Sequence, residues 1–267
     1  MTIIENRISK TIIIVSFFLN SFFSEAQNNS NTVTVTLKEV VLNSPKTSTS
    51  FNKLPLSVSF QEVEQYQNLF QQITLQDYLK AVPGLFTQNA NNYAQDLRVS
   101  LRGFGARSAF GIRGVKIIVD GIPETTPDGQ GQIDNIPLGL LKNLEVLRGP
   151  SASLYGNASG GVIYLNTIDY IEGKNFQLRT RLGAFGLQSY QLTASVKNDK
   201  TTALIHANRL LTDGFRNNSG LEQNLLNLKI KHKLNPSSKI QFQMNFTDSP
   251  RAEDAGGILS LIHISEP

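Results

Sequence analysis

The sequence predicts a small α+β domain followed by a run of two-faced antiparallel strands. Two observations support this fold class. Residues 56–167 combine one amphipathic helical segment with short apolar segments separated by glycine-rich turns, which is typical of a mixed sheet with helices on one side. From residue 174 onward, apolar and polar residues alternate, which places the apolar side chains on one face of each strand. We therefore expect two regions of different architecture.

Residues 1–26 have the features of a secretory signal peptide. Arg7 and Lys10 provide the positive start, an apolar run follows over 11–23, and Ser24 to Ala26 form a small-x-small cleavage site. The apolar run is shorter than the ~20 residues that a helix needs to span a bilayer, so we expect cleavage rather than a retained anchor. The chain contains no cysteine, which excludes a lipidated cysteine, disulfides and thiolate metal sites.

Residues 27–50 form a polar, low-complexity stretch that contains one β-prone run, LKEVVL. Its residues are Leu37, Lys38, Glu39, Val40, Val41 and Leu42. An extended apolar segment on a flexible tether can add as a strand to the sheet of a partner protein. Alternatively, Val40 and Val41 begin the sheet of the domain that follows. The residues alone leave both interpretations open.

The α+β region, residues 51–169, is predicted to contain one helix and four strands. The helix is expected within 73–85, with Thr74 and Asp77 capping its start and Pro83 and Gly84 ending it. Its apolar face is formed by four residues: Leu75, Tyr78, Leu79 and Val82. The strands are expected at 97–101, 117–119, 144–147 and 162–165, with glycine turns between them.

The alternating region spans residues 174–258. Apolar residues alternate with polar ones within 176–182, 190–196, 226–234 and 240–246, interrupted only at Thr180 and His232, and tight turns are expected at 198–200 and 235–238. Strands of ~10 residues joined in this way are typical of transmembrane β-barrel hairpins. A soluble antiparallel sandwich alternates in the same manner, so the pattern alone supports either. Residues 259–267 do not continue it and have the look of translated adapter sequence, so we exclude them from the fold.

The sequence does not contain the motifs of a catalyst or a nucleic-acid-binding protein. It has no GxSxG elbow, HExxH helix or paired-carboxylate constellation, and the glycine-rich segment 103–114 lacks both GxGxxG spacing and a Walker lysine. The net charge of +4 comes from scattered basic residues. We therefore expect neither an enzyme nor a nucleic-acid partner, and no cofactor or resident metal.

Three glycine-rich segments, in this order and spacing, closely resemble the plug domain of TonB-dependent outer-membrane receptors. They are LRGFGARSAFGIRG at 101–114, VDGIP at 119–123 and LEVLRGPSASLYGNASGGVIYLNT at 144–167. The resemblance implies an α+β plug domain over 51–169, followed over 174–258 by the first antiparallel strands of a transmembrane β-barrel. About five strands fit there, whereas a receptor barrel has ~22, so we expect a chain truncated at its C-terminus.

The resemblance also assigns roles to individual residues. Residues 37–42 correspond to the TonB box, which pairs with the periplasmic energy-coupling protein TonB. Arg102 and Arg148, with Glu145, match positions that fasten the plug to the barrel through barrel carboxylates. An arginine fork could equally bind an anionic ligand, but position favours the plug-to-barrel lock for these residues.

Four further residues are candidates for ligand binding. Arg107 and Ser108 match a loop tip that faces the external ligand vestibule. Gln130 and Gln132 match a GQxQ pattern that presents two glutamines to the ligand in ferric-dicitrate-type receptors. The same segment, TPDGQ, is also a common turn, and this interpretation stays open beside the first.

By resemblance, the protein is an outer-membrane receptor in contact with lipid, its N-terminus in the periplasm, importing a ferric siderophore or ferric citrate with energy from TonB. Cobalamin and an oligosaccharide are alternative cargoes within the family. A secreted soluble binding module or adhesin is the alternative outside it. A signal-transducing receptor would need an extra domain before the TonB box, and the ~10 residues after Ala26 leave no room for one.

Overall fold

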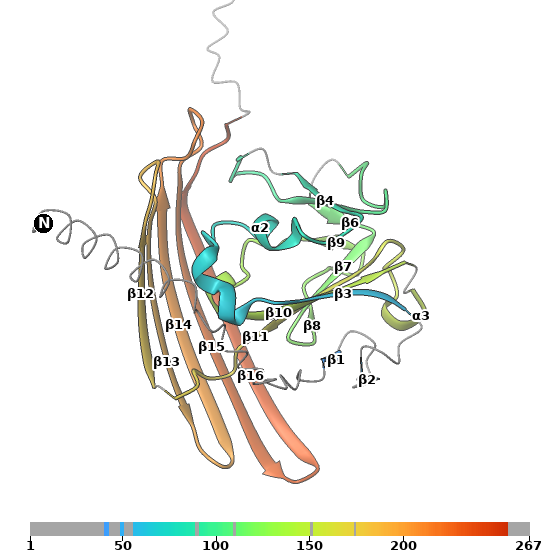
Figure 1. Ribbon diagram of the computed structural model, residues 1–267, viewed down its shortest axis with the longest axis vertical. Helices are drawn as coiled ribbons and strands as arrows, with labels where there is room; N and C mark the ends of the chain where they lie inside the picture. Colours follow the sequence, from blue (N-terminus) through green and yellow to red (C-terminus); the bar gives the residue numbers. More distant parts are fainter. Residues whose placement is uncertain are drawn as a thin grey trace, which may run out of the picture. The chain divides into compact units, whose positions relative to one another are not determined.

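The computed structural model describes residues 40–42, 49–50, 56–88, 91–108, 111–149, 152–173 and 175–255, which all belong to one compact unit. The signal segment 1–26, residues 37–39 of the LKEVVL run and the tail 259–267 lie outside the described residues. Two sheets of five strands dominate the described part (Figure 1). We call residues 56–168 the α+β domain and the second sheet the wall.

The α+β domain is built on a mixed sheet in the order β3-β10-β11-β7-β8. Its strands are β3 (Ser57–Glu62), β10 (Leu141–Arg148), β11 (Gly161–Thr167), β7 (Val115–Val119) and β8 (Ile122–Pro123). β10 pairs antiparallel with both β3 and β11, whereas β11 and β7 run parallel. The mixed sheet confirms the predicted fold class. The strands expected at 117–119, 144–147 and 162–165 are β7, β10 and β11, and each is longer than predicted. The strand expected at 97–101 lies at 98–101, in a separate sheet.

Apolar clusters cover both faces of this sheet. Leu144, Val146 and Ile163 belong to the larger cluster, whereas Leu147 and Val162 belong to the smaller one. Because successive residues of a strand point to opposite faces, a strand buried on both sides must be apolar at consecutive positions. This explains the consecutive apolar residues 162–165 of β11, whereas β10 has the buried Glu145 among its apolar residues.

Short elements complete the described part of the chain before the wall, and all of them except β1 and β2 lie in the α+β domain. They are β1 (Val41–Leu42), β2 (Thr49–Ser50), η2 (Glu64–Leu69), α2 (Gln76–Leu79), β4 (Leu85–Gln88), β5 (Arg98–Leu101), β6 (Ile112–Arg113), β9 (Gln130–Gly131), η3 (Leu138–Leu140) and α3 (Ala152–Tyr155). Three pairs form separate two-stranded sheets: β1 with β2, β4 with β5, and β6 with β9.

The predicted helix over 73–85 is much shorter in the structure, where only the single turn α2 is helical. The predicted cap by Thr74 and Asp77 is wrong: Leu75 is the N-cap and makes no side-chain cap bond, while Asp77 accepts a hydrogen bond from Lys80 at 2.7 Å. The expected apolar face does exist, since Leu75, Tyr78, Leu79 and Val82 are all buried in the larger cluster. Burial of these side chains therefore holds the segment in place more than helix formation does.

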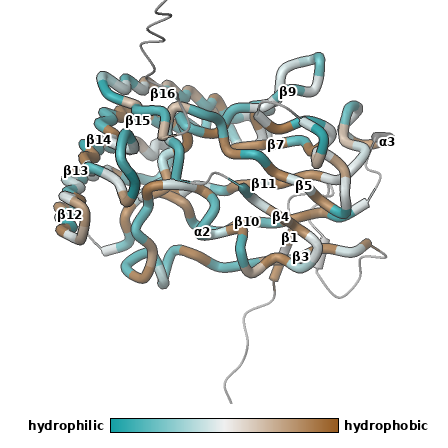
Figure 2. Tube along the Cα trace, turned by 90° about the horizontal axis from the view of Figure 1, so that it is seen from above, coloured by the Kyte–Doolittle hydropathy of each residue, from teal (hydrophilic) through white to brown (hydrophobic). Residues whose placement is uncertain are grey.

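The wall consists of five antiparallel strands in sequence order. They are β12 (Phe176–Leu182), β13 (Gln188–Lys197), β14 (Thr201–Thr212), β15 (Leu221–Asn235) and β16 (Ser238–Ala252). Their register aligns one apolar row across all five strands: Leu178, Leu192, Ala207, Leu226 and Phe246. Leu178, Leu192 and Phe246 of this row are exposed. Hydrophobic and hydrophilic residues alternate along these strands (Figure 2). The neighbouring row faces the α+β domain and is polar. Among the described helices, none is long and apolar enough to cross a membrane.

Candidate functional site

An open hollow lies where the segment LRGFGARS packs beside β6. It has a volume of about 610 Å³ and is lined by residues 103–108, Arg113, Gly114 and Ser159. The backbone N–H of Ser108 donates to the carbonyl of Gly105 at 3.1 Å, which closes the turn that carries Arg107. Arg107 and Arg113 are exposed and are the charged residues of this lining, so the hollow is electropositive.

The second predicted ligand segment forms a closed turn beside this hollow. Thr126 donates from its backbone N–H to the carbonyl of Gln130 at 2.8 Å, and Gln130 stands opposite Arg113 in the β6–β9 pair. The Thr126 hydroxyl and the Gln130 N–H both donate to the Asp128 carboxyl and hold its pKa below the usual value. Gln132 donates to Asp96 Oδ2 at 3.3 Å. The structure thus brings Arg107, Ser108 and Arg113 together with Gln130 alongside, while Gln132 is engaged by Asp96.

The three predicted lock residues do not form one group. Arg102 lies at the Pro83–Gly84 turn, where its backbone N–H donates to the Gly84 carbonyl at 2.9 Å, and Arg148 Nη1 donates to the Pro83 carbonyl at 3.3 Å. Glu145 is fully buried on the opposite face of β10 and accepts from Asn166 Nδ2 at 3.4 Å. Burial, together with the charge of Glu145, raises the pKa of Tyr155 to about 12.

The described part of the LKEVVL run lies against the smaller apolar cluster. Val41 and Leu42 form β1, which pairs antiparallel with Thr49 and Ser50 of β2 in a sheet separate from the central one. Leu42 is fully buried, and Val40 packs at the edge of the same cluster.

Polar side chains connect the α+β domain to the wall. Gln72, which is buried and has a left-handed backbone with φ +62°, accepts from Arg181 Nη1 at 2.9 Å and from Gln191 Nε2 at 2.7 Å. The backbone carbonyl of Gln67 in η2 accepts from Arg181 Nη2 at 3.2 Å, while its side chain donates within the domain to the carbonyls of Leu141 at 2.6 Å and Leu138 at 3.0 Å. These contacts were not predicted, although Arg181 and Gln191 are polar residues of alternating strands, which indicates where such contacts form.

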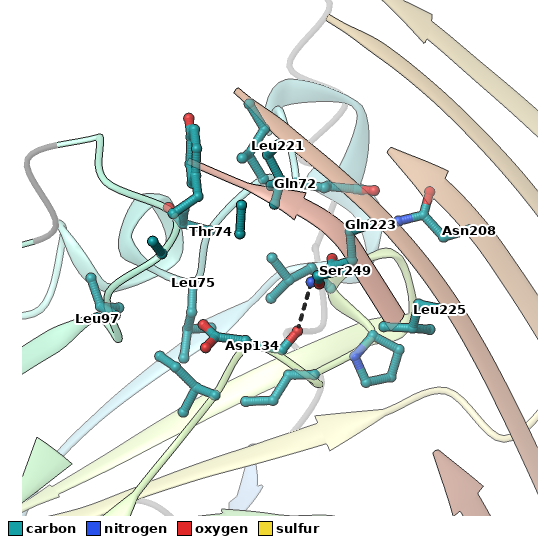
Figure 3. A pocket seen from close by; sticks show the side chains of 18 of the residues that line it. Gln72, Thr74, Leu75, Leu97, Asp134, Asn208, Leu221, Gln223, Leu225 and Ser249 are labelled. Carbon is teal, nitrogen blue, oxygen red and sulfur yellow. Dashed lines mark hydrogen bonds between the residues drawn. The ribbon is translucent and has the colours of Figure 1, made fainter. Parts of the chain in front are cut away.

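A cavity of about 210 Å³ lies between the domain and the wall. Figure 3 shows Gln72, Thr74 and Asp134 of the domain facing Asn208 and Gln223 of the wall, and Gln223 donates to the Asp134 carbonyl at 3.2 Å. In the part of the chain that the structure describes, no three potential metal-binding side chains come together. The chemistry of these surfaces is therefore that of hydrogen bonding and ion pairing.

The comparisons with known proteins identify the α+β domain. Residues 50–162 match the family model described as "TonB-dependent Receptor Plug Domain". Residues 50–162 therefore form a domain of the TonB-dependent receptor plug type. Among curated proteins, it is 37% identical over 125 residues to a hemin receptor of Yersinia enterocolitica, covering 45% of this chain and 17% of that protein. It is 32% identical over 111 residues to the vitamin B12 transporter BtuB of Vibrio vulnificus, covering 41% and 17%.

Solved receptors of this kind share the fold of both the plug domain and the wall. The pyoverdine outer membrane receptor FpvA from Pseudomonas aeruginosa matches with a TM-score of 0.62 at 16% identity, covering 78% of this chain and 30% of that one. The ferric-catecholate import receptor Fiu from E. coli matches at 0.61 and 19%, covering 80% and 30%. The chain thus spans about a third or less of the proteins that it matches, and the wall resembles the start of their barrels. These relatives are described as receptors and transporters, in agreement with the expectation of a non-enzymatic protein.

Proposed function

We propose that this chain is the N-terminal part of an outer-membrane transporter that imports an anionic metal chelate with energy from TonB. The observation that carries the proposal is a plug domain packed on a wall whose exposed face is apolar and whose face toward the plug buries polar residues, such as Gln191, Asn227 and Lys229, among leucines. Such a wall fits a bilayer, because lipid surrounds the apolar face and the backbone groups are paired between strands. A signal peptide over 1–26 would export the chain and leave the mature N-terminus in the periplasm.

The electropositive hollow supports the choice of cargo. Arg107 and Arg113 can donate charge-assisted hydrogen bonds to a carboxylate or catecholate group, and Gln130 adds a neutral polar side chain beside them. Gln132 can join after exchanging its bond to Asp96. Ferric complexes of catecholate siderophores, ferric citrate and hemin carry negative charge, so the hollow suits these cargoes. The metal would arrive already chelated and would belong to the cargo.

Energy coupling would take place near the N-terminus. Residues 37–42 would add as a strand to TonB after Leu42 leaves its buried position. Arg102 and Arg148 would fasten the plug to strands of the barrel beyond this chain, and Glu145 would support β10. The Nε atom of Arg148 is buried and has no hydrogen-bond partner among the described residues.

Cobalamin is a second candidate cargo, because one relative is a vitamin B12 transporter. The hollow discriminates between the two classes by charge. Cobalamin binding would depend little on the arginines, whereas binding of an anionic chelate would lose a charge-assisted hydrogen bond with each.

Binding to the complete receptor in detergent tests the proposal. Arg107→Ala and Arg113→Ala should each weaken binding of an anionic ferric siderophore by about tenfold or more, whereas Lys142→Ala, exposed on β10, should leave it unchanged. Deleting residues 37–42 should abolish uptake by cells but spare binding. Uptake that survives the deletion, or chelate affinity that ignores both arginines, would contradict the proposal.

A further inference from the structure

One charged side chain of the wall is entirely buried against the plug domain. Lys229 on β15 is 1% exposed, and its ammonium group donates to Asp120 Oδ2 at 2.8 Å and to Asp169 Oδ1 at 3.2 Å. It also donates to the carbonyl of Ile168 at 3.4 Å and to the hydroxyl of Thr167. All four partners lie where β7 and β11 end and the chain leaves the domain for the wall. We call these four residues the corner.

The corner is organised to receive this charge. Asp120, in the VDG turn, has a left-handed backbone with φ +51°, which is uncommon for a residue with a side chain. Its carboxylate accepts from both the backbone N–H of Thr167 at 2.8 Å and the hydroxyl of Thr167 at 2.7 Å. Asp120 therefore joins the end of β7 to the end of β11 before it accepts Lys229.

The charges of the cluster balance. Asp169 also accepts from Lys231 at 2.7 Å, so two lysines face two aspartates. Burial alone would raise the pKa of Asp169, but the hydrogen bond from Lys231 and the charge of Lys229 hold it below the usual value. A neutral cluster has no net charge to offer a ligand, so its function is attachment rather than binding.

The ion pair of Lys80 with Asp77 lies within the domain, and that of Arg209 with Glu222 lies within the wall. Elsewhere the two parts meet through amides, through Arg181 and through an apolar cluster in which Ile73 and Tyr93 of the domain pack against Leu187, Leu210 and Leu221 of the wall. The amides and Arg181 can exchange partners with water at low cost. A buried ammonium cannot do so, because leaving its carboxylates without a replacement would strand a charge in a dry site.

We propose that Lys229 is a positioning residue that anchors the corner of the plug to the wall. Under the transport function proposed above, on which this second statement rests, the corner stays attached while TonB displaces the end of the plug that carries β1. Asp120 then connects Lys229 to the sheet, because its carboxylate also binds Thr167 at the end of β11 and Asp120 itself follows β7.

Hydrogen exchange in the complete receptor tests the anchor without reference to transport. Lys229→Met removes the charge and keeps an unbranched chain, and Lys231→Met is the matched control on the same face of β15. The amides of Asp120 and Thr167 should exchange about tenfold faster or more in Lys229→Met, while those of β3 change by less than about twofold. Lys231→Met should have a much smaller effect. Unchanged exchange at the corner, or equal acceleration across the sheet, overturns the anchor.

A second variant keeps the test decisive if Lys229→Met fails to fold. The double variant Lys229→Met/Asp120→Asn leaves less uncompensated charge in the cluster and should fold. It should still show fast exchange at Thr167, and exchange as slow as in the unmodified receptor overturns the proposal.

The mechanical role has its own readout. Cells with a folded Lys229 variant should admit a large fluorescent solute when TonB is present, and not when it is absent. Equal leakage in cells with and without TonB would contradict the mechanical role and leave Lys229 with a structural role only. If uptake assays disprove transport altogether, the exchange result at the corner still stands by itself.

Discussion

Gly161 at the start of β11 is a tightly constrained position in the segment 144–167. It pairs with Arg148 across the β10–β11 ladder and has a φ of +139°, which side-chain-bearing residues rarely adopt. A Cβ atom added there would lie 2.2 Å from the carbonyl oxygen of Leu147 and 2.7 Å from Leu101 Cδ2. The first neighbour is backbone in the centre of the sheet, so it cannot move aside without disturbing β10.

Comparison with Gly149→Ala separates the two contributions to the destabilisation by Gly161→Ala, which are backbone strain and steric overlap. Gly149 also has a positive φ, +105°, but a Cβ atom there would meet nothing within 4 Å. Backbone strain of about 1–3 kcal/mol applies to both substitutions. Overlap in a packed interior adds about 1–3 kcal/mol at Gly161 alone. We therefore expect Gly161→Ala to destabilise the domain by about 1–3 kcal/mol more than Gly149→Ala does.

Hydrogen exchange of the β10 and β11 amides in increasing urea measures this difference, because it reports the free energy of opening for this sheet rather than for the whole receptor. Both variants should retain the native pattern of protection, with lower opening free energies. Equal losses at Gly149 and Gly161 would refute the overlap argument. A decrease in opening free energy for Gly149→Ala alone would refute the assigned backbone conformation and packing at Gly161.

Two further predictions concern polar groups of the plug domain. Burial and the nearby charge of Asp96 raise the pKa of Asp134 to about 7, so the folded state binds the proton more tightly than the unfolded chain. The protonated carboxyl group therefore contributes stability below the ordinary pKa of 3.8, and this contribution is lost as the pH rises toward 7. The effect is small because Asp134 is partly exposed. Asp134→Asn should flatten a plot of melting temperature against pH between these two values. Gln67→Leu should lower the free energy of unfolding by about 1–3 kcal/mol in urea titrations, because two buried carbonyls lose their donor, whereas exposed Gln65→Leu should be neutral.

The parts of the fold that depend on periodicity were predictable from the sequence. Alternation over 226–230 and 240–246 sets which face of each strand is apolar, and the observed register places Leu226 opposite Phe246 on one face. Strands were predicted at 144–147 and 162–165, and the structure has β10 and β11 there.

Elements that depend on tertiary contacts were not predictable. β3 was missed because Ser57–Glu62 has no strong apolar pattern, and its position is set by pairing with β10. The helix was predicted too long because the chain after α2 continues in turns, closed by hydrogen bonds from Val82 N–H to the Leu79 carbonyl and from Leu85 N–H to the Val82 carbonyl. For the candidate site, the turn carrying Arg107 was visible in the glycines around it. The separation of Glu145 from Arg148 followed only from the faces of β10.

Lys229 shows where sequence patterns contain more than they first reveal. Its place between Leu228 and Ile230 predicts a side chain pointing away from the apolar face and toward the plug. A lysine buried there must meet carboxylates, because a desolvated ammonium without them is unstable. The sequence offers aspartates beside two strand ends, Asp120 and Asp169, but only the fold brings both to one ammonium. Alternation thus predicts that a charge faces inward, whereas the pairing of distant elements determines what receives it.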